Sequence, residues 1–462
     1  MVYFPSIAKP YKYFYYPQCL QSTAAAYYNR HNPQILDTYE PRNISRMYRH
    51  IRKFVCHPAA YTRQEYVDSM PTAFKRRQYQ RVLDELNQGA MVRSTIEPFT
   101  KLEKFPTTKY KPPRMIQARH YTFNIAYGRF IKPLENYITK FGKHKHHFGK
   151  GNYDDIASNI DKLAKKYRYY TELDHDSFDA RITVEMLTLS HKFYQACYHH
   201  NKELRELSKR TLNNKCKTRS GEKYKCYGSR MSGDVDTSFG NSIINYAIIK
   251  ELLKQLKLKG DCIVNGDDCI IFTDEPIPIE TSQEILATMN MKSKMQPSVT
   301  NIHHVEFCRT KLVYRSDGTK TMMMNPQRVY QTFGMTYRLN ESKSYHRYLE
   351  EVMICNAIIN MNTPIGHHWA ALYGKPIDRT TPIQFKYVTR DLERIVEKQR
   401  GTIESSKEFT PSMFQAWPDS LQYVRKIRTI MSRPIPNNYM VVINHDSKRI
   451  AISYYNDKPK PP

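Results

Sequence analysis

The sequence lacks several features that mark other classes of protein. No apolar run approaches the roughly 20 residues that a helix needs to cross a bilayer, and the N-terminus has no signal-peptide pattern. The nine cysteines form no Cys-x-x-Cys pair and their number is odd, which favours reduced thiols over a disulfide framework. There is no internal repeat and no low-complexity segment. We therefore expect a soluble protein that reaches a membrane only through a partner.

Acidic residues are scarce relative to basic ones. The 462 residues contain 72 Lys and Arg against 44 Asp and Glu, and the formal charge of +28 is spread along the chain. Such an excess points to an acidic partner, and nucleic acid is the commonest one, although a basic enzyme or a membrane-surface protein would have a similar composition. Hydrophobic residues make up 40% and aromatic residues 12%, which is typical of a globular chain with two or three subdomains.

The apolar periodicity predicts a mixture of helices and short strands. Helices are expected over 72–92, 153–166, 183–212, 237–259, 341–361 and 389–399. Strands are expected over 167–173, 303–315 and 319–324, and residues 98–120 read as a basic ribbon or loop broken by proline. Residues 1–60, rich in Tyr, Pro and Arg, look like an extended arm packed on a larger body, and 457–462 looks like a loose tail.

Two adjacent acids stand in the run Cys262-Ile263-Val264-Asn265-Gly266-Asp267-Asp268-Cys269-Ile270-Ile271-Phe272. An Asn-Gly step between two apolar, β-prone runs predicts a hairpin that holds Asp267 and Asp268 at its tip. Neighbouring carboxylates repel each other and lose solvation there, so a cation must offset them, and Mg²⁺ bound through oxygen fits best. A solvated acidic turn is the alternative, and this segment alone does not separate the two.

A second acidic cluster, Asp174-His175-Asp176-Ser177-Phe178-Asp179, follows the β-prone run at 167–173. An acid at the end of a strand is well placed for a rigid metal site. Asp179 lies five positions after Asp174 (179 − 174) and can reach a second part of the same cleft. An ordinary Asp-rich turn, or the Asp-x-Asp pattern of nucleotide-sugar glycosyltransferases, would look the same at this point.

The third segment, Ser232-Gly233-Asp234-Val235-Asp236-Thr237-Ser238-Phe239-Gly240-Asn241, precedes the clearest helical pattern in the chain. A Ser-Gly step lets a backbone approach a ligand closely. Thr237 and Asn241 lie one helical turn apart and share a face, where a hydroxyl and an amide can read a sugar hydroxyl. Helix capping explains Ser, Asp or Thr here, but it does not explain Asn241 on the following turn.

In order and spacing, the three segments resemble motifs A, B and C of the RNA-directed RNA polymerases of positive-strand RNA viruses, in detail the tombusvirus-like ones. Asp174–Asp179 matches D-x4-D, Ser232–Asn241 matches S-G-x3-T-x3-N, and Gly266–Asp268 matches G-D-D. Lys111–Gln117 and Gly128–Glu135 are similar to the basic fingers segment of that family, and Val305–Cys308 is similar to its motif E. The resemblance covers roughly residues 95–375.

The resemblance implies RNA-templated RNA synthesis from NTPs, for replication and transcription of a viral genome. Two Mg²⁺ ions, which Mn²⁺ can replace, would assist nucleotidyl transfer. The implied catalytic and metal-binding residues are Asp174, Asp267 and Asp268. The implied substrate-binding residues are Asp179, Asn241 and Thr237 at the ribose, Ser232 and Gly233 at the template or nucleotide, and Arg114 and Lys101 at the triphosphate. A general acid for pyrophosphate would be Lys292 or Lys294, and the sequence does not decide between them.

The resemblance also implies an α+β fold of the right-hand type, with an antiparallel palm sheet backed by helices. The expected division is an N-terminal arm at 1–60, fingers at 61–166, palm at 167–182, a fingers insertion at 183–229, palm at 230–312, and thumb with the C-terminal tail at 313–462. The implied partners are RNA template, RNA product and NTPs. A membrane-anchored viral partner would hold the protein at replication complexes in the host cytoplasm.

Three other classes stay open on the sequence alone. A glycosyltransferase would not need Asp267, and an RNA-binding or capsid protein would never consume NTPs. A reverse transcriptase would share the palm, but the pairing of Asp179 with Asn241 argues for ribonucleotides. The histidines at 144–147 and 303–304 lack the Cys/His spacing of a zinc site, so we expect them at the surface or facing RNA.

Overall fold

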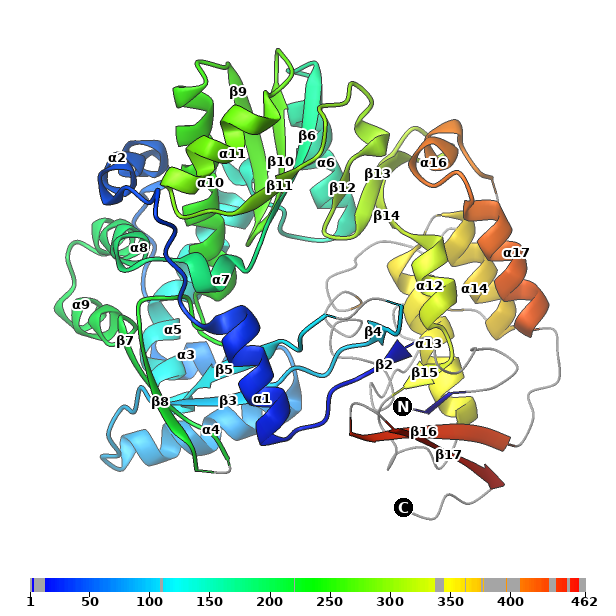
Figure 1. Ribbon diagram of the computed structural model, residues 1–462, viewed down its shortest axis with the longest axis horizontal. Coiled ribbons are helices and arrows are strands. Elements are labelled where there is room, and N and C mark those ends of the chain that lie inside the picture. The colour runs from blue at the N-terminus through cyan, green and yellow to red at the C-terminus, as the bar shows by residue number, and fades with distance from the viewer. Residues whose placement is uncertain are drawn as a thin grey trace.

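The computed structural model describes an α+β protein with several antiparallel sheets (Figure 1). It describes residues 2–3, 13–108, 111–219, 221–336, 345–361, 363–374, 377, 396, 408–431, 438–446 and 449–456. The helix expected at 389–399, apart from Val396, and the tail at 457–462 lie outside these residues. Within them, no helix is both long and apolar enough to cross a bilayer.

A four-stranded antiparallel sheet lies at the top of Figure 1, in the order β11-β6-β10-β9. Its strands are β6 (Tyr169–His175), β9 (Gly260–Asn265), β10 (Asp268–Thr273) and β11 (Ser293–Met295). The hairpin predicted around Asp267 is confirmed, since Asp268 pairs with Asn265. Its two turn residues are Gly266, with φ +69°, and Asp267, so glycine takes the first turn position, as type II′ hairpins require.

Helices cover both faces of this sheet. On one face, Leu173, Cys269 and Ile271 share a core with α10 (Thr237–Gln255) and α11 (Ile279–Thr288). On the other, Ile270 and Phe272 pack with α6 (Tyr153–Ala164), which the sequence predicted at 153–166. Neighbouring strand residues point to opposite faces, so alternate residues of β10 pack into the two different cores. Polar side chains of the sheet therefore reach solvent mainly at the strand ends.

The N-terminal region is helical between residues 20 and 54, which corrects the expectation of an extended arm. Its elements are α1 (Leu20–Ala26), the π-helix η1 (Tyr27–His31), α2 (Pro41–Ile51) and the 3-10 helix η2 (Arg52–Phe54). In α2, Ile44, Met47 and Ile51 follow helical spacing and are buried against α8 and α10. The sequence prediction missed this helix because it is short and most of its other residues are charged or polar.

A second sheet, in the order β5-β3-β7-β8, lies at the lower left of Figure 1. Its strands are β3 (Ile96–Thr100), β5 (Met115–Arg119), β7 (Asn213–Lys217) and β8 (Lys223–Tyr227). The surrounding helices are α3 (Arg63–Asp68), α4 (Ala73–Asn87), α5 (Tyr121–Asn136), α7 (Phe178–Arg181), α8 (Val184–Cys197) and α9 (Lys202–Lys209). The ribbon expected at 98–120 is confirmed, and the helical stretch expected at 183–212 is two helices, since His199 and His200 between them have positive φ.

The C-terminal third begins with the three-stranded sheet β12 (Glu306–Phe307), β13 (Thr310–Tyr314) and β14 (Lys320–Met324). Helices at the right of Figure 1 follow: α12 (Pro326–Thr332), α13 (Tyr345–Ile359), α14 (Pro364–Tyr373), α16 (Pro411–Ala416) and α17 (Ser420–Met431). A further sheet joins β1 (Val2–Tyr3), β15 (Met335–Thr336), β16 (Asn438–Asp446) and β17 (Arg449–Asn456). The helix expected at 341–361 is confirmed by α13.

The N-terminal and C-terminal parts meet directly. The short strands β2 (Tyr13–Phe14) and β4 (Phe105–Pro106) pair beside α12, and the Tyr13 hydroxyl donates a hydrogen bond to Gln331, 3.1 Å away. The Lys104 ammonium donates to the carbonyl oxygen of Met335 at 2.8 Å. Burial lowers the pKa of Lys104 to about 8. These contacts link the β3–β5 side to the C-terminal helices.

Three short helices complete the fold: η3 (Tyr137–Phe141), η4 (Lys145–His147) and η5 (Ile302–His304).

The histidines near residue 145 do not all face solvent, contrary to expectation. His147 is 3% exposed, and its Nδ1 donates to the carbonyl oxygen of Cys262, 3.1 Å away. Burial lowers the pKa of His147 to about 3, so the ring is neutral. The sequence prediction failed because consecutive histidines show no periodicity from which the buried ring could be identified.

Candidate active site

Two predicted acids from distant segments meet at one end of the central sheet. The register between β6 and β10 pairs Leu173 with Cys269, so the next positions, Asp174 and Asp268, lie opposite each other on one face. Both are exposed, whereas Leu173 and Cys269 are buried. Asp267 occupies the adjoining turn. The fold therefore brings the three predicted metal-binding acids to one end of the sheet, where β6 ends and β10 begins.

The carboxylates influence one another electrostatically. Loss of solvation and the negative charges of Asp267 and Asp174 raise the pKa of Asp268 to about 6. Burial, with a smaller contribution from Asp267, also raises the pKa of Asp179 to about 6. Like charges held together favour either a shared proton or a bound cation. A cation at this edge would therefore relieve repulsion that the fold itself creates.

The acids do not form a closed metal cage. Among the described residues, no group of three or more His, Cys, Asp or Glu side chains is arranged to hold a metal ion. Mg²⁺ does not need such a cage, because it keeps several waters and usually binds through one or two carboxylates together with substrate phosphates. Asp174, Asp267 and Asp268 offer only oxygen donors on a solvent-facing edge. This donor set fits a divalent cation that arrives with a phosphate group.

The α10 helix fixes the turn that carries Asp267. The Asn245 side-chain nitrogen donates to the carbonyl oxygens of Gly266 and Asp267, each at 3.0 Å. One turn earlier, the Ser242 hydroxyl accepts a hydrogen bond from the Gly266 backbone N–H at 2.8 Å. Three hydrogen bonds from one helix thus hold the backbone of a two-residue turn, and the position of the Asp267 side chain follows from them.

His175 extends this network to the other strands. Its Nε2 lies 3.1 Å from the Asn245 side-chain oxygen, and its Nδ1 lies 2.7 Å from the Ser293 hydroxyl of β11. Because the Asn245 nitrogen already donates to the turn, its oxygen faces His175, so Nε2 carries the proton. Burial lowers the pKa of His175 to about 4, and the ring is neutral. A signal existed in the sequence: Asn241 and Asn245 stand one turn apart on an apolar helix.

Asp179 and Asn241, paired by the sequence analysis, are in contact. The Asn241 side-chain nitrogen donates to the Asp179 carboxylate at 2.7 Å, and its oxygen accepts from Arg230 Nε at 3.0 Å. Arg230 is fully buried and forms an ion pair with Asp236 at 2.7 Å. The amide of Asn241 is therefore oriented on both sides, and it presents Asp179 in one fixed position.

The other residues of the third segment contact protein in this structure. The Ser232 hydroxyl donates to the Met115 carbonyl oxygen at 3.0 Å, and the Thr237 hydroxyl donates to the Met231 carbonyl oxygen at 2.8 Å. A Cβ on Gly233 would lie 2.5 Å from the Gln117 carbonyl oxygen, so only glycine lets the loop pack on β5. The backbone at Gly233, which we expected to approach a ligand closely, thus lies against strand β5 in this structure.

Two buried ion pairs hold this loop. Arg119 of β5 binds both carboxylate oxygens of Asp234 through Nε and Nη2, at 2.6 and 2.8 Å, and both side chains are buried. Asp236, at the N-cap of α10, makes no side-chain cap and binds Arg230 instead. Breaking one buried pair of this kind costs about 3–5 kcal/mol. Asp234 and Asp236 therefore have structural partners that the sequence did not identify.

The two cations expected at the triphosphate share one carboxylate. Arg114 Nε donates to Glu103 at 2.7 Å, and Lys101 Nζ lies 3.3 Å from the same carboxylate. Arg114 is also close enough to Asp179 for its positive charge to lower the pKa of that carboxyl. Lys101 and Arg114 are therefore grouped beside the Asp179–Asn241 pair, with Glu103 as counter-ion.

Arg30 is a further cation that the sequence analysis missed. It lies in the π-helix η1, is partly buried, and is within electrostatic range of Arg114, Glu103, Asp176 and Asp174. Burial and the charge of Arg114 lower its pKa. Across the described part of the chain, no hydrogen bond or ion pair holds its guanidinium. No recognisable motif surrounds Arg30, so only the fold reveals it.

Lys292 and Lys294 occupy different positions relative to Asp174. Lys294 lies directly opposite Asp174 in the pairing of β11 with β6, so the two side chains share a face. The Lys292 carbonyl oxygen instead accepts the Asp176 backbone N–H at 2.7 Å. Both side chains are exposed. The register favours Lys294 as the lysine nearer to the acids.

The tip of the β12–β13 hairpin also reaches the acids. Its turn residues Cys308 and Arg309 have φ of 51° and 65°, the backbone of a type I′ turn formed without glycine. The Asn265 side-chain nitrogen donates to the Cys308 sulfur at 3.3 Å, and Cys308 and Arg309 partly offset the rise in the pKa of Asp268. The segment assigned by resemblance to motif E is therefore adjacent to Asp268.

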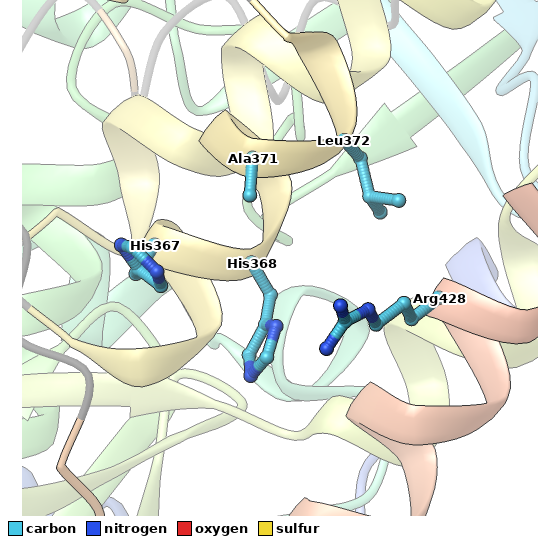
Figure 2. A pocket seen from close by; sticks show the side chains of 5 residues that line it. All are labelled: His367, His368, Ala371, Leu372 and Arg428. Carbon is cyan, nitrogen blue, oxygen red and sulfur yellow. The ribbon is translucent and has the colours of Figure 1, made fainter. Parts of the chain in front are cut away.

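A separate hollow of about 400 Å³ lies between α14 and α17 (Figure 2). His368 and Arg428 face it from opposite sides in this view, with His367, Ala371 and Leu372 completing the lining. None of the predicted site residues lines it. The hollow thus does not bear on the carboxylate site.

Comparisons with known proteins find matches over most of the chain. Residues 26–410 match the family model described as viral RNA dependent RNA polymerase. The chain is 30% identical over 297 residues to the RNA-directed RNA polymerase of Oat chlorotic stunt virus (isolate United Kingdom), covering 59% of this chain and 39% of that protein. It is 29% identical over 320 residues to that of Turnip crinkle virus, covering 64% and 40%. It is 30% identical over 291 residues to that of Tomato bushy stunt virus (strain Cherry), covering 58% and 35%. The chain spans less than half the length of these relatives.

Proposed function

The chain belongs to the family of viral RNA-dependent RNA polymerases, and we propose that it synthesises RNA on an RNA template from NTPs. The observation that carries the proposal is the position of Asp174 opposite Asp268, with Asp267 in the adjoining turn. Segments 93 positions apart (267 − 174) supply these acids, and all three are exposed at one end of two strands whose neighbouring residues Leu173 and Cys269 are buried.

We assign the three acids to metal-assisted nucleotidyl transfer. Two divalent cations held there, Mg²⁺ or Mn²⁺, would stabilise charge on the attacking and leaving oxygens at the α-phosphate. Asp174 and Asp267 would bind them, with Asp268 assisting. The α10 helix holds the backbone of the Asp267 turn through Asn245 and Ser242, so this backbone would be in position before substrate arrives. Lys294, beside Asp174, is our choice of proton donor to pyrophosphate.

We assign recognition of the nucleotide to the residues around Asn241. Asp179 and Asn241 would bind the ribose and favour a 2′-hydroxyl, with Thr237 nearby. Arg114 and Lys101 would exchange their contact with Glu103 for the triphosphate, and Ser232 and Gly233 would position the template or nucleotide through their contacts with β5. This assignment is supported by the 2.7 Å hydrogen bond from Asn241 to Asp179 and by the positive charge of Arg114, which acts on the Asp179 carboxyl.

The proposed architecture is a right hand. The sheet β11-β6-β10-β9 with α10 and α6 would be the palm, the β5-β3-β7-β8 sheet and its helices the fingers, and the helices after β14 the thumb. The Lys104 and Tyr13 contacts would then join fingers to thumb. This proposal keeps the boundaries expected from the sequence, with palm at 167–182 and 230–312.

The deciding experiment is RNA-templated incorporation of labelled NTP by wild type and Asp267→Ala. We expect Asp267→Ala to lose incorporation by a factor of at least about 10³, because an inner-sphere metal ligand is removed, and to keep its fold by circular dichroism. Glu284→Ala, an exposed acid on α11, is the matched control and should retain full activity. Unchanged incorporation by Asp267→Ala would refute the assignment.

The same assay separates the other enzyme classes. Template-independent turnover of a nucleotide sugar would indicate a glycosyltransferase, and incorporation of dNTPs in preference to NTPs would indicate a reverse transcriptase. RNA binding that survives in Asp174→Ala/Asp267→Ala, with no NTP consumed by the wild type, would leave only an RNA-binding protein. Each result points to one class because the classes differ in template and substrate.

We also propose that the protein acts at membrane-associated replication complexes in the host cytoplasm through a membrane-anchored viral partner. The proposal rests on the family and on no feature of the described residues. Flotation of the protein with membranes only when other viral proteins are co-expressed would support it. Flotation of the protein alone, or no flotation in either case, would overturn it.

A further inference from the structure

A lysine outside the predicted motifs lies near the acidic turn, on the side of β9. Phe148 forms a parallel bridge with Val264 of β9, and the Gly149 backbone N–H donates to the Val264 carbonyl oxygen at 2.8 Å. Both segments run in the same direction there, so the chain leads from Phe148 towards the turn that follows β9. Lys150 is the next residue along this path.

Close packing fixes the backbone of this segment. A Cβ on Gly149 would lie 2.3 Å from the Phe307 ring of β12 and 3.3 Å from the Cβ of Asn265. Phe307 is itself buried, so its ring has little room to move aside, and Phe148 is fully buried. The position from which the Lys150 side chain extends is therefore set by packing.

Two serines of α10 link the Lys150 ammonium to the turn that carries Asp267. The ammonium donates to the Ser238 hydroxyl. One helical turn later, the Ser242 hydroxyl donates to the Ser238 carbonyl oxygen at 2.7 Å and accepts the Gly266 backbone N–H at 2.8 Å. The helix that holds the turn thus also holds the lysine.

The Lys150 ammonium has donor capacity left for a ligand. It offers three N–H donors. Ser238 accepts one of them, and the Glu135 carboxylate of α5 lies 3.5 Å away, at the distance of a loose ion pair. The Lys150 side chain is 15% exposed, so it is held in place without being enclosed. With these two partners among the described residues, at least one donor remains for an anion.

Lys150 and the proposed nucleotide-binding residues lie on opposite sides of the acids. In the sheet, β10 stands between β6 and β9. Asp179 follows β6, whereas the segment of Lys150 runs beside the end of β9. In nucleotidyl transfer, the attacking hydroxyl and the leaving pyrophosphate are in line across the α-phosphate. Since the proposed function puts the NTP on the β6 side, the strand that attacks it comes from the β9 side.

We propose that Lys150 binds a backbone phosphate of the RNA strand that is being extended, close to its 3′ end. The inference rests on the proposed function and adds to it a residue that holds the attacking strand. The phosphate would take a donor that Ser238 leaves free. A lysine contact to phosphate positions a strand without reading its sequence, so the effect should be the same for all RNA sequences.

The test measures binding of a defined RNA primer–template to the full chain without NTP. In roughly 0.15 M salt, Lys150→Gln should bind about fivefold more weakly, because one phosphate contact is lost. The slope of log Kd against log salt should fall by about 1. Lys150→Arg keeps the charge and should bind as wild type does. Melting temperatures show that both variants are folded before the comparison is made.

The matched control is Lys250→Gln. Lys250 is also half-buried and belongs to the same helix, but its ammonium donates to the Gly260 carbonyl oxygen at 2.7 Å, at the opposite end of β9. It also lies 3.7 Å from the Asp261 carboxylate, as Lys150 does from Glu135 at 3.5 Å. Lys250→Gln should change neither the affinity for RNA nor its salt dependence.

Neutral methylphosphonate linkages identify the strand that Lys150 contacts. In wild type, one such linkage near the 3′ end of the primer should weaken binding about fivefold. In Lys150→Gln the same linkage should have no further effect, because a double-mutant cycle shows coupling between groups in contact. Linkages in the template should weaken the binding of wild type and Lys150→Gln equally.

Three results would overturn the proposal. Equal affinity of Lys150→Gln and wild type would remove the contact, and coupling confined to template linkages would assign Lys150 to the other strand. The third is an equal loss of affinity in Glu135→Gln, which would show that Lys150 acts only through its ion pair. The proposal instead predicts that Glu135→Gln binds RNA at least as tightly as wild type, since the ammonium is released.

The binding assay separates this inference from the proposed function, because NTP incorporation is measured independently. Coupling of Lys150 to the primer, without incorporation by wild type, would keep the RNA contact and refute the polymerase assignment. Incorporation by wild type without such coupling would keep the polymerase assignment and refute the role of Lys150.

Discussion

The Asn245 side-chain nitrogen lies 3.0 Å from the Asp267 carbonyl oxygen, so a helix residue holds the backbone of the turn that carries the central acid. The same amide group faces His175 through its oxygen. One side chain therefore connects both acidic segments, which lie on different strands. The placement of the acids depends on an uncharged residue that has no chemistry of its own.

Replacing Asn245 by alanine tests this connection. We expect the free energy of unfolding to fall by about 2–3 kcal/mol, because the carbonyl oxygens of Gly266 and Asp267 and the buried ring of His175 lose their partner. We also expect RNA synthesis per folded molecule to fall at least about tenfold. Denaturant unfolding and NTP incorporation measure the two effects.

The matched control for this experiment is Asn356→Ala. Asn356 is also a buried helix asparagine, but its side-chain nitrogen donates only within α13, to the Val352 carbonyl oxygen at 2.8 Å. It should lose stability and retain synthesis. If Asn245→Ala and Asn356→Ala lose stability and synthesis in the same proportion, the link between Asn245 and the acids is wrong.

Asn241→Ala tests discrimination between ribose and deoxyribose. The change removes the donor that orients the Asp179 carboxylate, and one such hydrogen bond accounts for about 1.4 kcal/mol, or about tenfold. We expect the preference for NTP over dNTP, measured as the ratio of kcat/KM values, to drop by about that factor. A preference that does not change while both substrates lose activity would show that Asn241 has only a structural role.

Arg30→Ala tests the cation that the fold places beside Arg114. We expect KM for NTP to rise about tenfold with a smaller change in kcat, since an unpaired, partly buried guanidinium is suited to a phosphate group. Arg30→Lys should recover part of the loss. Arg52→Ala, an exposed arginine outside the site, should leave KM unchanged. A normal KM in Arg30→Ala would remove Arg30 from the site.

His147 makes the stability of the protein sensitive to acid. Its pKa is about 3 in the folded protein and ordinarily about 6.5, so the unfolded chain binds a proton first as the pH falls. The contribution of His147 is complete above pH about 6.5 and is lost below it, at about 1.4 kcal/mol per pH unit. His147→Asn keeps a donor for the Cys262 carbonyl and removes the titration. Its unfolding free energy should therefore fall less steeply from pH 6.5 to 5 than that of wild type. Equal slopes would contradict this account.

The sequence predicted the parts of the fold in which local pattern and tertiary structure agree. Periodicity located α10 and α6, and the Asn-Gly step located the β9–β10 hairpin, because apolar spacing and turn chemistry are local properties. The same reasoning missed α2, in which Ile44, Met47 and Ile51 stand among arginines and polar residues. It also placed His147 at the surface, where the fold buries it.

The candidate site was predicted only where residue type signals chemistry. Clustered acids such as Asp174 and Asp267 can be identified as site residues from the sequence. Asn245 gives only a weak signal in the sequence, and Arg30 gives none, because Arg30 comes near Arg114 only in the folded chain. Whether Ser232 and Thr237 contact substrate stays a prediction, since both hydroxyls donate to backbone carbonyls here.

The register of β6 against β10 couples chemistry to hydrophobic packing. A slip of one residue would turn Asp268 into the apolar interior and expel Cys269, and the core formed with α10 opposes that exchange. Substitutions around Leu173 that loosen this interior would therefore misdirect the acids while the chain still looks folded. Substitutions that abolish function without unfolding the protein should therefore occur at buried apolar positions next to the acids, such as Leu173 and Cys269.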